Sequence, residues 1–177
     1  MKLVILDRDG TINHDSDHYI KSPNEWRPIE GALEAIARLA QAGYRIVVAT
    51  NQSGIAQGLF DTATLIAIHD TLQRAAVQAG GRIDAFFFCP HAAGSACACR
   101  KPQPGMPLEV ARRFNIALKD TYMVGDTHRD VAAAAAAGAR PVLVLTGRGR
   151  STRDEGDLPA GTEVFESLAA FAQHIAP

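Results

Sequence analysis

Short apolar runs alternate along this chain with segments whose apolar residues recur at helical spacing. The apolar runs, which are typical of buried strands, lie at residues 3–6, 45–49, 85–88, 122–124 and 142–145. The helical segments lie at residues 29–42, 107–114, 131–137 and 168–175, and Asp61 is a suitable N-cap for a further helix that reaches about residue 78. Strands that alternate with helices predict an α/β fold, with a mainly parallel sheet between two helical layers.

Polar residues gather where three of these strands end. They follow Leu6, Ala49 and Val124 directly. Ligands of a parallel sheet bind just beyond the carboxyl ends of its strands, so we expect these residues to form one site. Residues 146–161 are rich in Gly, Arg and Asp, and this composition predicts a mobile surface loop.

Length and composition are those of one ordinary globular domain, which we expect to span residues 1–177. The 18 basic and 19 acidic residues leave a net charge of -1, which gives no general field for nucleic acid or an anionic membrane. No apolar run approaches the roughly 20 residues that span a bilayer, and the N-terminal run is too short for a signal peptide. We therefore predict a cytoplasmic protein, by default a monomer.

The first predicted strand leads into Asp7-Arg8-Asp9-Gly10-Thr11. Carboxylates two positions apart in a loop can converge on one site, and a glycine lets backbone N–H groups reach an anion. An isolated pair of this kind is more often a solvated turn, but here an apolar strand precedes it and Gly-Thr follows. The segment resembles D-x-D-G-T, the first motif of the haloacid dehalogenase superfamily.

Three further motifs follow in the order that this superfamily has. Thr50 resembles the second motif, Lys101 before Pro102 resembles the third, and residues 125–130 resemble the fourth, G-D-x-x-x-D. The chain is thereby identified as a member of the superfamily, which implies a Rossmann-like three-layer sandwich. The connections 7–28 and 50–60 are too short for the separate cap domain that many members carry.

The resemblance implies a magnesium-dependent phosphatase that works through an aspartyl-phosphate. Asp7 would attack phosphorus, while Asp9 would protonate the leaving alkoxide and then deprotonate a water. The first of these jobs needs a protonated carboxyl, which we attribute to crowding by neighbouring acids. Asp7, the backbone carbonyl of Asp9 and Asp126 would hold Mg²⁺, a hard ion that prefers oxygen ligands. Lys101 would screen the repulsion between Asp7 and the phosphate, whose oxygens Thr50 would hold.

Two residues of the fourth motif, Thr127 and Asp130, are expected to support the site. For Asp130 two interpretations stay open. It supports the metal site through water, or it caps the helix predicted at residues 131–137.

All three cysteines lie within eleven positions together with one histidine, as Cys89, His91, Cys97 and Cys99. Clustered thiols in a cytosolic protein indicate a metal site rather than disulfides. Three thiolates and one imidazole enclose Zn²⁺ tetrahedrally without an open position, which is typical of a structural ion. This loop, at about residues 89–99, resembles the zinc loop of the heptose-bisphosphate and histidinol-phosphate phosphatases of the superfamily. Its spacer, residues 92–96, is shorter than we expect for the heptose enzymes.

Candidate substrate contacts are polar or flexible residues near the motifs: Gly10, Asp15, Asp17, His18, Asn51, Gln52, Ser53, Arg100 and Lys101. Short polar side chains are suited to hydrogen bonds with sugar hydroxyls. For any single residue of the 13–20 loop, plain solvation is the more common case. Arg148 and Arg150 either reach a second phosphate or form a basic pair that faces solvent.

The resemblance implies a small phosphorylated sugar as the substrate. The leading hypothesis for the reaction is removal of the C7 phosphate of heptose 1,7-bisphosphate, in the synthesis of nucleotide-activated heptose for surface polysaccharide. Histidinol phosphate is the alternative substrate on the same scaffold. A non-catalytic phosphoacceptor domain is a third hypothesis, which the first motif and the zinc loop disfavour.

Overall fold

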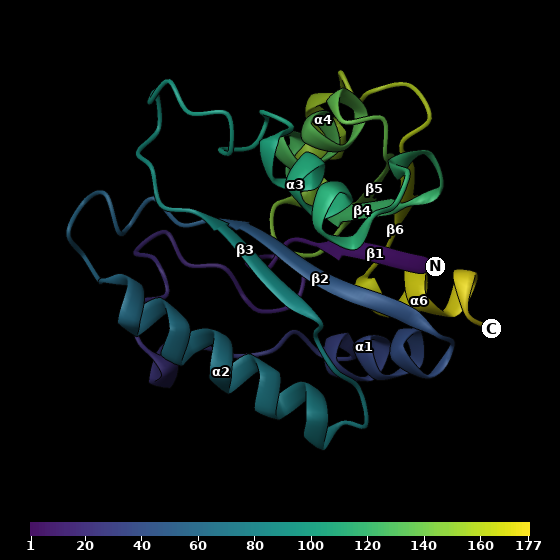
Figure 1. The fold of residues 1–177 in the computed structure, drawn as a ribbon, viewed down its shortest axis with the longest axis horizontal. Coiled ribbons are helices and arrows are strands. Elements are labelled where there is room, and N and C mark those ends of the chain that lie inside the picture. Colours follow the sequence, from purple (N-terminus) through teal and green to yellow (C-terminus); the bar gives the residue numbers. More distant parts are fainter.

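A parallel sheet of six strands forms the centre of the computed structural model, which describes residues 1–177 (Figure 1). The strands are β1 (Lys2–Leu6), β2 (Tyr44–Asn51), β3 (Ala85–Cys89), β4 (Tyr122–Gly125), β5 (Arg140–Val144) and β6 (Glu163–Phe165). Their spatial order is β3-β2-β1-β4-β5-β6, and every neighbouring pair is parallel. The chain order reverses between β1 and β4, and ligands of such sheets bind beside this switch point.

Helices cover both faces of the sheet. One face carries α1 (Ala32–Gln41), α2 (Thr62–Gln78) and α6 (Leu168–Ile175), and the other carries α3 (Gly105–Phe114) and α4 (His128–Ala136) (Figure 1). In β1, Val4 and Leu6 enter the core under the first group, while Leu3 and Ile5 enter the core under the second. Burial on both faces explains why the inner positions of the central strands are continuously apolar, as in residues 3–6 and 46–49. The predicted three-layer α/β class is confirmed.

The prediction for residues 146–161 was wrong. Helix α5 (Gly149–Glu155) lies there and follows the end of β5, and the short strand β6 comes after it. In α5 only Gly149 and Thr152 are buried, so this helix has no apolar periodicity for a sequence reading to detect. The other elements that complete the chain are two 3₁₀ helices, Pro23–Glu25 and Leu118–Asp120.

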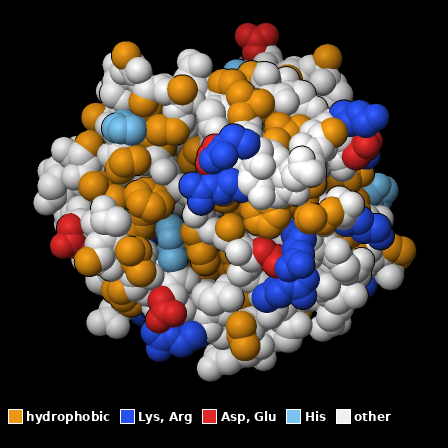
Figure 2. Space-filling view, viewed as in Figure 1, with side chains coloured by type: hydrophobic (Ala, Val, Ile, Leu, Met, Phe, Trp, Pro, Cys, Tyr) orange, Lys and Arg blue, Asp and Glu red, His pale blue; other side chains and the backbone are white.

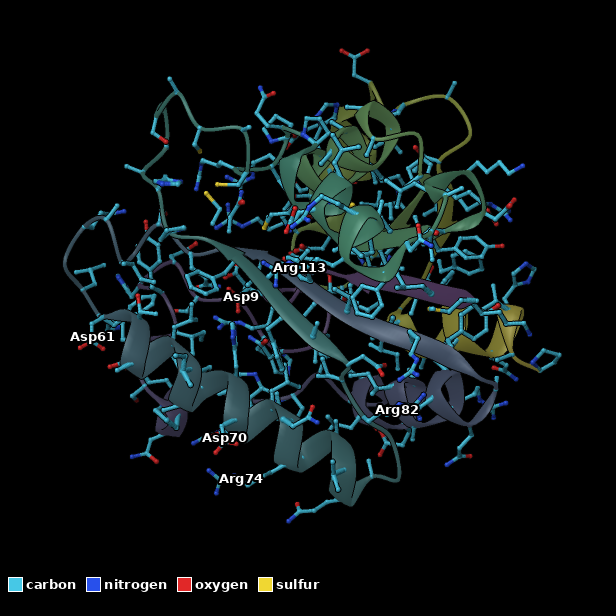
Figure 3. The ribbon with its side chains drawn as sticks, viewed as in Figure 1. Asp9, Asp61, Asp70, Arg74, Arg82 and Arg113 are labelled. Carbon is cyan, nitrogen blue, oxygen red and sulfur yellow. The ribbon has the colours of Figure 1, made fainter.

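Asp61 caps α2 as predicted, because its carboxylate accepts a hydrogen bond of 2.8 Å from the backbone N–H of Thr64. Figure 3 shows Asp61 at the beginning of this helix, with Asp70 and Arg74 on its outer side, where they form an ion pair. Acidic and basic side chains lie mostly beside one another on the face in Figure 2, in agreement with the balanced net charge. None of the helices combines the length and apolar content that crossing a membrane requires.

Helix α6 begins with a similar cap, since the hydroxyl oxygen of Ser167 accepts a hydrogen bond of 3.2 Å from the backbone N–H of Ala170. We expect Ser167→Ala to lower the free energy of unfolding by about 1 kcal/mol, because an N–H group of the first turn loses its acceptor. Urea denaturation measures this loss. Ser167→Asn keeps a capping oxygen and should retain most of the stability. Equal losses in both variants would contradict the capping role.

Candidate active site

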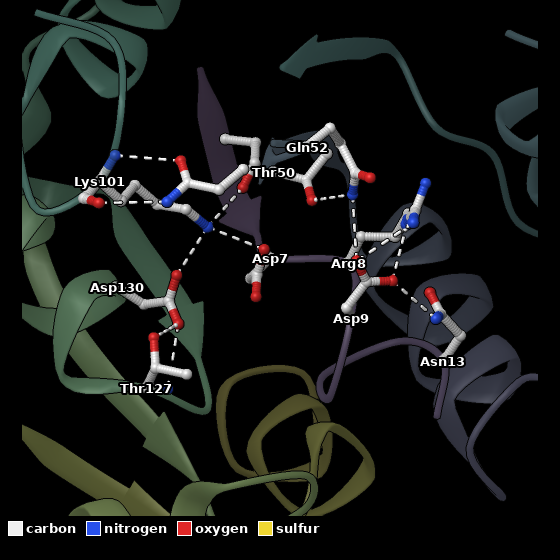
Figure 4. Close-up of polar contacts among 11 residues, drawn as sticks. Asp7, Arg8, Asp9, Asn13, Thr50, Gln52, Lys101, Thr127 and Asp130 are labelled. Atoms are coloured by element: carbon white, nitrogen blue, oxygen red, sulfur yellow. Dashed lines mark hydrogen bonds and ion pairs between the residues drawn. The ribbon is translucent and has the colours of Figure 1, made fainter. Parts of the chain in front are cut away.

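Three strand ends bring buried polar residues together at the carboxyl edge of the sheet (Figure 4). Asp7 follows β1, Thr50 lies near the end of β2, and Asp126 follows β4, all nearly inaccessible to solvent. A pocket opens above them, and its lining is polar except for Tyr19: Asp7, Asp9, Asp15, Ser16, Asp17, Tyr19, Thr50, Asn51, Gln52, Ser53, Arg100, Lys101, Asp126, Thr127, Arg129, Asp130 and Arg148. The expected convergence of the three polar clusters is therefore present.

Lys101 lies at the centre of this cluster and is fully buried. Its Nζ donates to Asp7 Oδ1 at 2.7 Å and to the carbonyl of Ala49 at 2.8 Å, and it lies 2.6 Å from Asp130 Oδ1. Three acceptors thus satisfy the three protons of the ammonium group. Burial alone would lower the pKa of Lys101, but Asp130 and Asp7 outweigh it and raise the pKa, so the side chain is charged.

Asn51 fixes the backbone of Lys101. Its side-chain amide donates to the Lys101 carbonyl at 3.1 Å, and its side-chain oxygen accepts from the Lys101 N–H at 3.0 Å. This pair of hydrogen bonds ties the loop after β3 to the end of β2, although the two residues are fifty positions apart. It positions the lysine ammonium beside Asp7.

Asp130 takes two roles at once. One carboxylate oxygen accepts from the N–H and the hydroxyl of Thr127, at 3.0 and 2.6 Å, and so closes a capping box at the start of α4. The other oxygen pairs with Lys101. The helix-capping interpretation is therefore present in the structure, and the contact with Lys101 belonged to neither interpretation.

The buried carboxylates of Asp7, Asp126 and Asp130 offer oxygen atoms within 4.8 Å of one another. Burial, followed by the charge of Asp130, raises the pKa of Asp7 to about 7 and that of Asp126 to about 8. One oxygen of Asp126 accepts from the backbone N–H of Arg148 at 2.8 Å, but the buried Oδ1 has no hydrogen-bond partner. Crowded carboxylates and an unpartnered oxygen fit a hard divalent cation such as Mg²⁺.

Gly10 leaves room for the Asp126 carboxylate. It has a φ of 82°, and a Cβ atom placed on it would lie 2.0 Å from Asp126 Oδ2. Only glycine meets both conditions, so Gly10 shapes the carboxylate cluster rather than lining the pocket.

Asp9 is where the structure contradicts the expected protonation. Its carboxylate accepts from Arg8 Nε at 2.9 Å and Nη2 at 3.1 Å, from Asn13 at 2.9 Å and from Gln52 at 3.0 Å (Figure 4). Burial would raise the pKa of Asp9, but Arg8 and the two amides outweigh it and lower the pKa. The crowding we expected at Asp9 acts on Asp7 and Asp126 instead, because Asp9 turns toward donors and away from the other acids.

Thr50 and Gln52 lie side by side, and the Gln52 amide donates to Thr50 Oγ1 at 2.9 Å. The Thr50 hydroxyl therefore accepts one bond and keeps its own proton for a ligand in the pocket. Sequence reasoning placed both residues near the substrate but did not find that Gln52 also contacts Asp9.

The three cysteines and His91 converge in the loop that leads from β3 to Lys101. The distances from His91 Nδ1 to the sulfurs of Cys89 and Cys99 are 3.4 and 3.3 Å, and that between the sulfurs of Cys89 and Cys97 is 3.8 Å. The edges of a tetrahedral zinc site with these ligands are about 3.6–3.8 Å long. A hydrogen bond from Ser95 lowers the pKa of Cys97 to about 6, which favours its thiolate, whereas burial raises the pKa of Cys89, so the thiolate of Cys89 would depend on the charge of a bound ion. The donor set and its spacing fit Zn²⁺.

The expected substrate loop is only partly at the pocket. Asp15 and Asp17 line it, together with Tyr19, which sequence reasoning did not include, whereas His18 is exposed and lies outside the lining. Arg148 bridges to Asp15 and Asp17 at 3.4 and 3.1 Å. Arg150 instead pairs with Glu166 at 2.8 Å. The two arginines therefore do not act as a pair, and only Arg148 lines the pocket.

Arg8 and Arg129 were also missed. Arg129 lines the pocket, and Arg8 is fully buried although it occupies the variable position of the first motif. The signal for Arg8 was its place between two carboxylates, Asp7 and Asp9, since a buried cation needs an anionic partner.

Comparison with known proteins agrees with this geometry. Residues 98–171 match the model of the HAD-hydrolase-like family. The chain is 57% identical to the D-glycero-beta-D-manno-heptose-1,7-bisphosphate 7-phosphatase of Bordetella bronchiseptica, over 99% of this chain and 98% of that one. It is 49% identical to the enzyme of the same name from Pseudomonas putida, over 99% of both chains.

The fold is also similar to that of a solved structure over almost the whole chain. The crystal structure of D,D-heptose 1,7-bisphosphate phosphatase from B. bronchiseptica, complexed with magnesium and phosphate, superposes with a TM-score of 0.97. The match covers 99% of this chain and 98% of the other, at 57% identity.

Proposed function

The chain belongs to the D-glycero-beta-D-manno-heptose-1,7-bisphosphate 7-phosphatase family of the haloacid dehalogenase superfamily, and we propose that it removes the C7 phosphate of this heptose bisphosphate. The observation that carries the proposal is the pairing of Asp7 with Lys101 at the carboxyl edge of the sheet, in a pocket lined by polar side chains. A phosphorylated sugar suits such a lining because its hydroxyl and phosphate oxygens need hydrogen-bond partners.

Asp7 is the nucleophile in this proposal. Lys101 holds Oδ1, so the other carboxylate oxygen is available to attack phosphorus and to form the aspartyl-phosphate. The ammonium of Lys101 also neutralises part of the charge that gathers when a carboxylate meets a phosphate. Thr50 contributes its free hydroxyl proton to a phosphate oxygen.

Asp9 is the proton-transfer residue in this proposal. Its four donors favour the ionised form, which is the form that takes a proton from the attacking water in the second half of the reaction. Protonation of the leaving alkoxide in the first half requires the protonated form of Asp9, which these donors disfavour. The side-chain arrangement therefore corresponds to the base rather than the acid stage.

Asp7, Asp126 and the backbone carbonyl of Asp9 would hold Mg²⁺, and Asp130 and the N-cap residue Thr127 support them from the start of α4. When bound, the ion supplies positive charge at the carboxylates and the phosphate. Gly10 and the N–H of Arg148 shape the Asp126 side of this site.

Substrate contacts follow from the pocket. We infer that Ser53 and Arg100 face the phosphate and that Asp15 and Asp17 face the sugar hydroxyls. The side chains of Asn51 and Gln52 also line the pocket, but their hydrogen bonds to Lys101, Asp9 and Thr50 give them a supporting role. His18 carries no such role, because it lies outside the lining.

The test is phosphate release in the presence of magnesium from the β and α anomers of the heptose bisphosphate and from histidinol phosphate. We expect kcat/KM for the β anomer to exceed that for histidinol phosphate at least about a hundredfold, a difference of roughly 3 kcal/mol. A preference for histidinol phosphate would move the chain to amino-acid biosynthesis. Turnover of none of the three would overturn the proposal.

We expect one zinc ion for each chain, held by Cys89, His91, Cys97 and Cys99. Cys99→Ser should reduce bound zinc to well below one ion and lower the melting temperature, because metal binding stabilises the folded loop. Elemental analysis and a thermal melt measure both effects. Ala93→Ser, which adds a hydroxyl to the same exposed loop without removing a ligand, is the control. Full zinc content in Cys99→Ser would refute the ligand set.

We also propose a single domain over residues 1–177, with the loop at 89–99 as its zinc-binding element, that works as a monomer in the cytoplasm. The support for the compartment is chemical, because a zinc site of three cysteines needs reduced thiols. Light scattering tests the oligomeric state. The dephosphorylated heptose would then serve the synthesis of nucleotide-activated heptose.

A further inference from the structure

A buried histidine with no assigned role lies next to Arg8 of the first motif. His69, on α2, is 6% exposed, and its ring stacks on Phe86 of β3 with centroids 4.4 Å apart and planes 13° apart. Phe88 packs against it edge-on, with centroids 6.5 Å apart. Two aromatic rings from the sheet thus fix the plane of the imidazole.

The one polar contact of the imidazole with a side chain is with Arg8, whose Nη1 lies 3.3 Å from His69 Nε2. A guanidinium only donates hydrogen bonds, so Nε2 must accept and carries no proton. Burial, followed by the charge of Arg8, lowers the pKa of His69 to about 3, which agrees with a neutral ring. His69 therefore acts as a fixed acceptor for a buried cation.

Arg8 uses its other nitrogens on Asp9. Nε and Nη2 contact the two oxygens of the Asp9 carboxylate, at 2.9 and 3.1 Å, while Nη1 points to the histidine. The guanidinium is planar and rigid, so fixing one nitrogen fixes the direction of the fork. The orientation of Asp9 is thus coupled to a residue on α2, sixty positions further along the chain.

We propose that His69 is a positioning residue for the reaction, which acts through Arg8 to hold the Asp9 carboxylate in its place beside Asn13 and Gln52. This rests on the proposed function of Asp9 in proton transfer. The role concerns where the carboxylate lies, since proton-transfer groups must stay within hydrogen-bond reach of the reacting atoms.

His69→Phe keeps an aromatic ring against Phe86 but removes the acceptor for Arg8. We expect kcat to fall about tenfold or more, since small misplacements of reacting groups cost that much, while KM changes less than about twofold, because Asp9 transfers a proton and does not set affinity. His69→Gln retains an acceptor atom and should recover most of kcat. Ile68→Val, a buried change on the same helix without polar contacts, is the control for lost packing.

A second measurement does not depend on turnover. In ¹⁵N NMR spectra of the protein, an Arg8 guanidinium fixed at both ends gives separate Nη signals, and His69→Phe should merge them, whereas His69→Gln and Ile68→Val should not. Wild-type kcat in His69→Phe, or a loss equal to that in Ile68→Val, would overturn the proposal. So would unchanged Nη signals. Failure of the wild-type chain to hydrolyse the heptose bisphosphate would overturn the proposed function instead, and the NMR result would then still decide whether His69 fixes Arg8.

Discussion

Asp7→Asn should abolish phosphate release, with kcat at least about 10⁴-fold below that of the wild-type chain. Asparagine keeps the shape of the side chain, but its amide cannot attack phosphorus, and loss of a nucleophile is among the largest single effects known in enzymes. Steady-state assays on the heptose bisphosphate measure the loss. Acid quenching with labelled substrate should trap a phosphorylated wild-type chain and no label on the variant.

The same substitution should leave the fold intact. Burial raises the pKa of Asp7 to about 7, so the folded state tolerates loss of this charge well. The melting temperature of Asp7→Asn should equal or exceed that of the wild-type chain. Asp120→Asn, at an exposed position, is the control and should keep full activity. Activity of Asp7→Asn within tenfold of the wild type would exclude Asp7 as the nucleophile.

Lys101→Met should destabilise the fold by about 3–5 kcal/mol at neutral pH. It removes the cation between Asp7 and Asp130 and leaves two buried carboxylates without it, and breaking a buried pair in this way costs that much. Chemical denaturation without added magnesium measures the change. Lys119→Met removes an exposed lysine and should have no measurable effect.

The loss in Lys101→Met should shrink as the pH falls. Asp7 already has a folded pKa near 7, and Lys101 lowers it, so in the variant this pKa lies higher still. A carboxyl whose folded pKa exceeds its unfolded value of 3.8 contributes its full stability below that value, and the contribution is lost as the pH rises through the folded pKa. The gap to the wild type should therefore be smaller at about pH 6 than at pH 8.5. A gap that widens in acid would show that the carboxylates are not the source of the loss.

Residue patterns predicted the scaffold well because burial dictates it. The helix at 168–175 has the predicted bounds, and each predicted strand lies within two residues of the observed one. Helix α5 and strand β6 were not predicted, because α5 buries only Gly149 and Thr152 and β6 has only three residues. Thr152 anchors α5 through a hydrogen bond from its hydroxyl to the backbone carbonyl of Asp126.

In the site, motif spacing identified which residues meet, but not which way each side chain points. The direction of Asp9 depends on Arg8, Asn13 and Gln52 together, so its low pKa could not follow from the sequence. The contact between Asp130 and Lys101 likewise depends on Thr127, which orients the carboxylate, and on Asn51, which holds the lysine backbone. Such arrangements depend on contacts between elements far apart in the sequence.

Both ends of the zinc loop are tied to a single residue. Asn51 pairs with Cys89 in the sheet and grips the backbone of Lys101 with its side chain. The segment between these two anchors is a closed loop, and the entropy of closing a loop depends only weakly on its length. The length and sequence of this loop can therefore change without moving the lysine. For protein engineering, residues 92–96 are therefore the segment to exchange when substrate specificity is to be changed and the residues that bind the phosphate are to be kept.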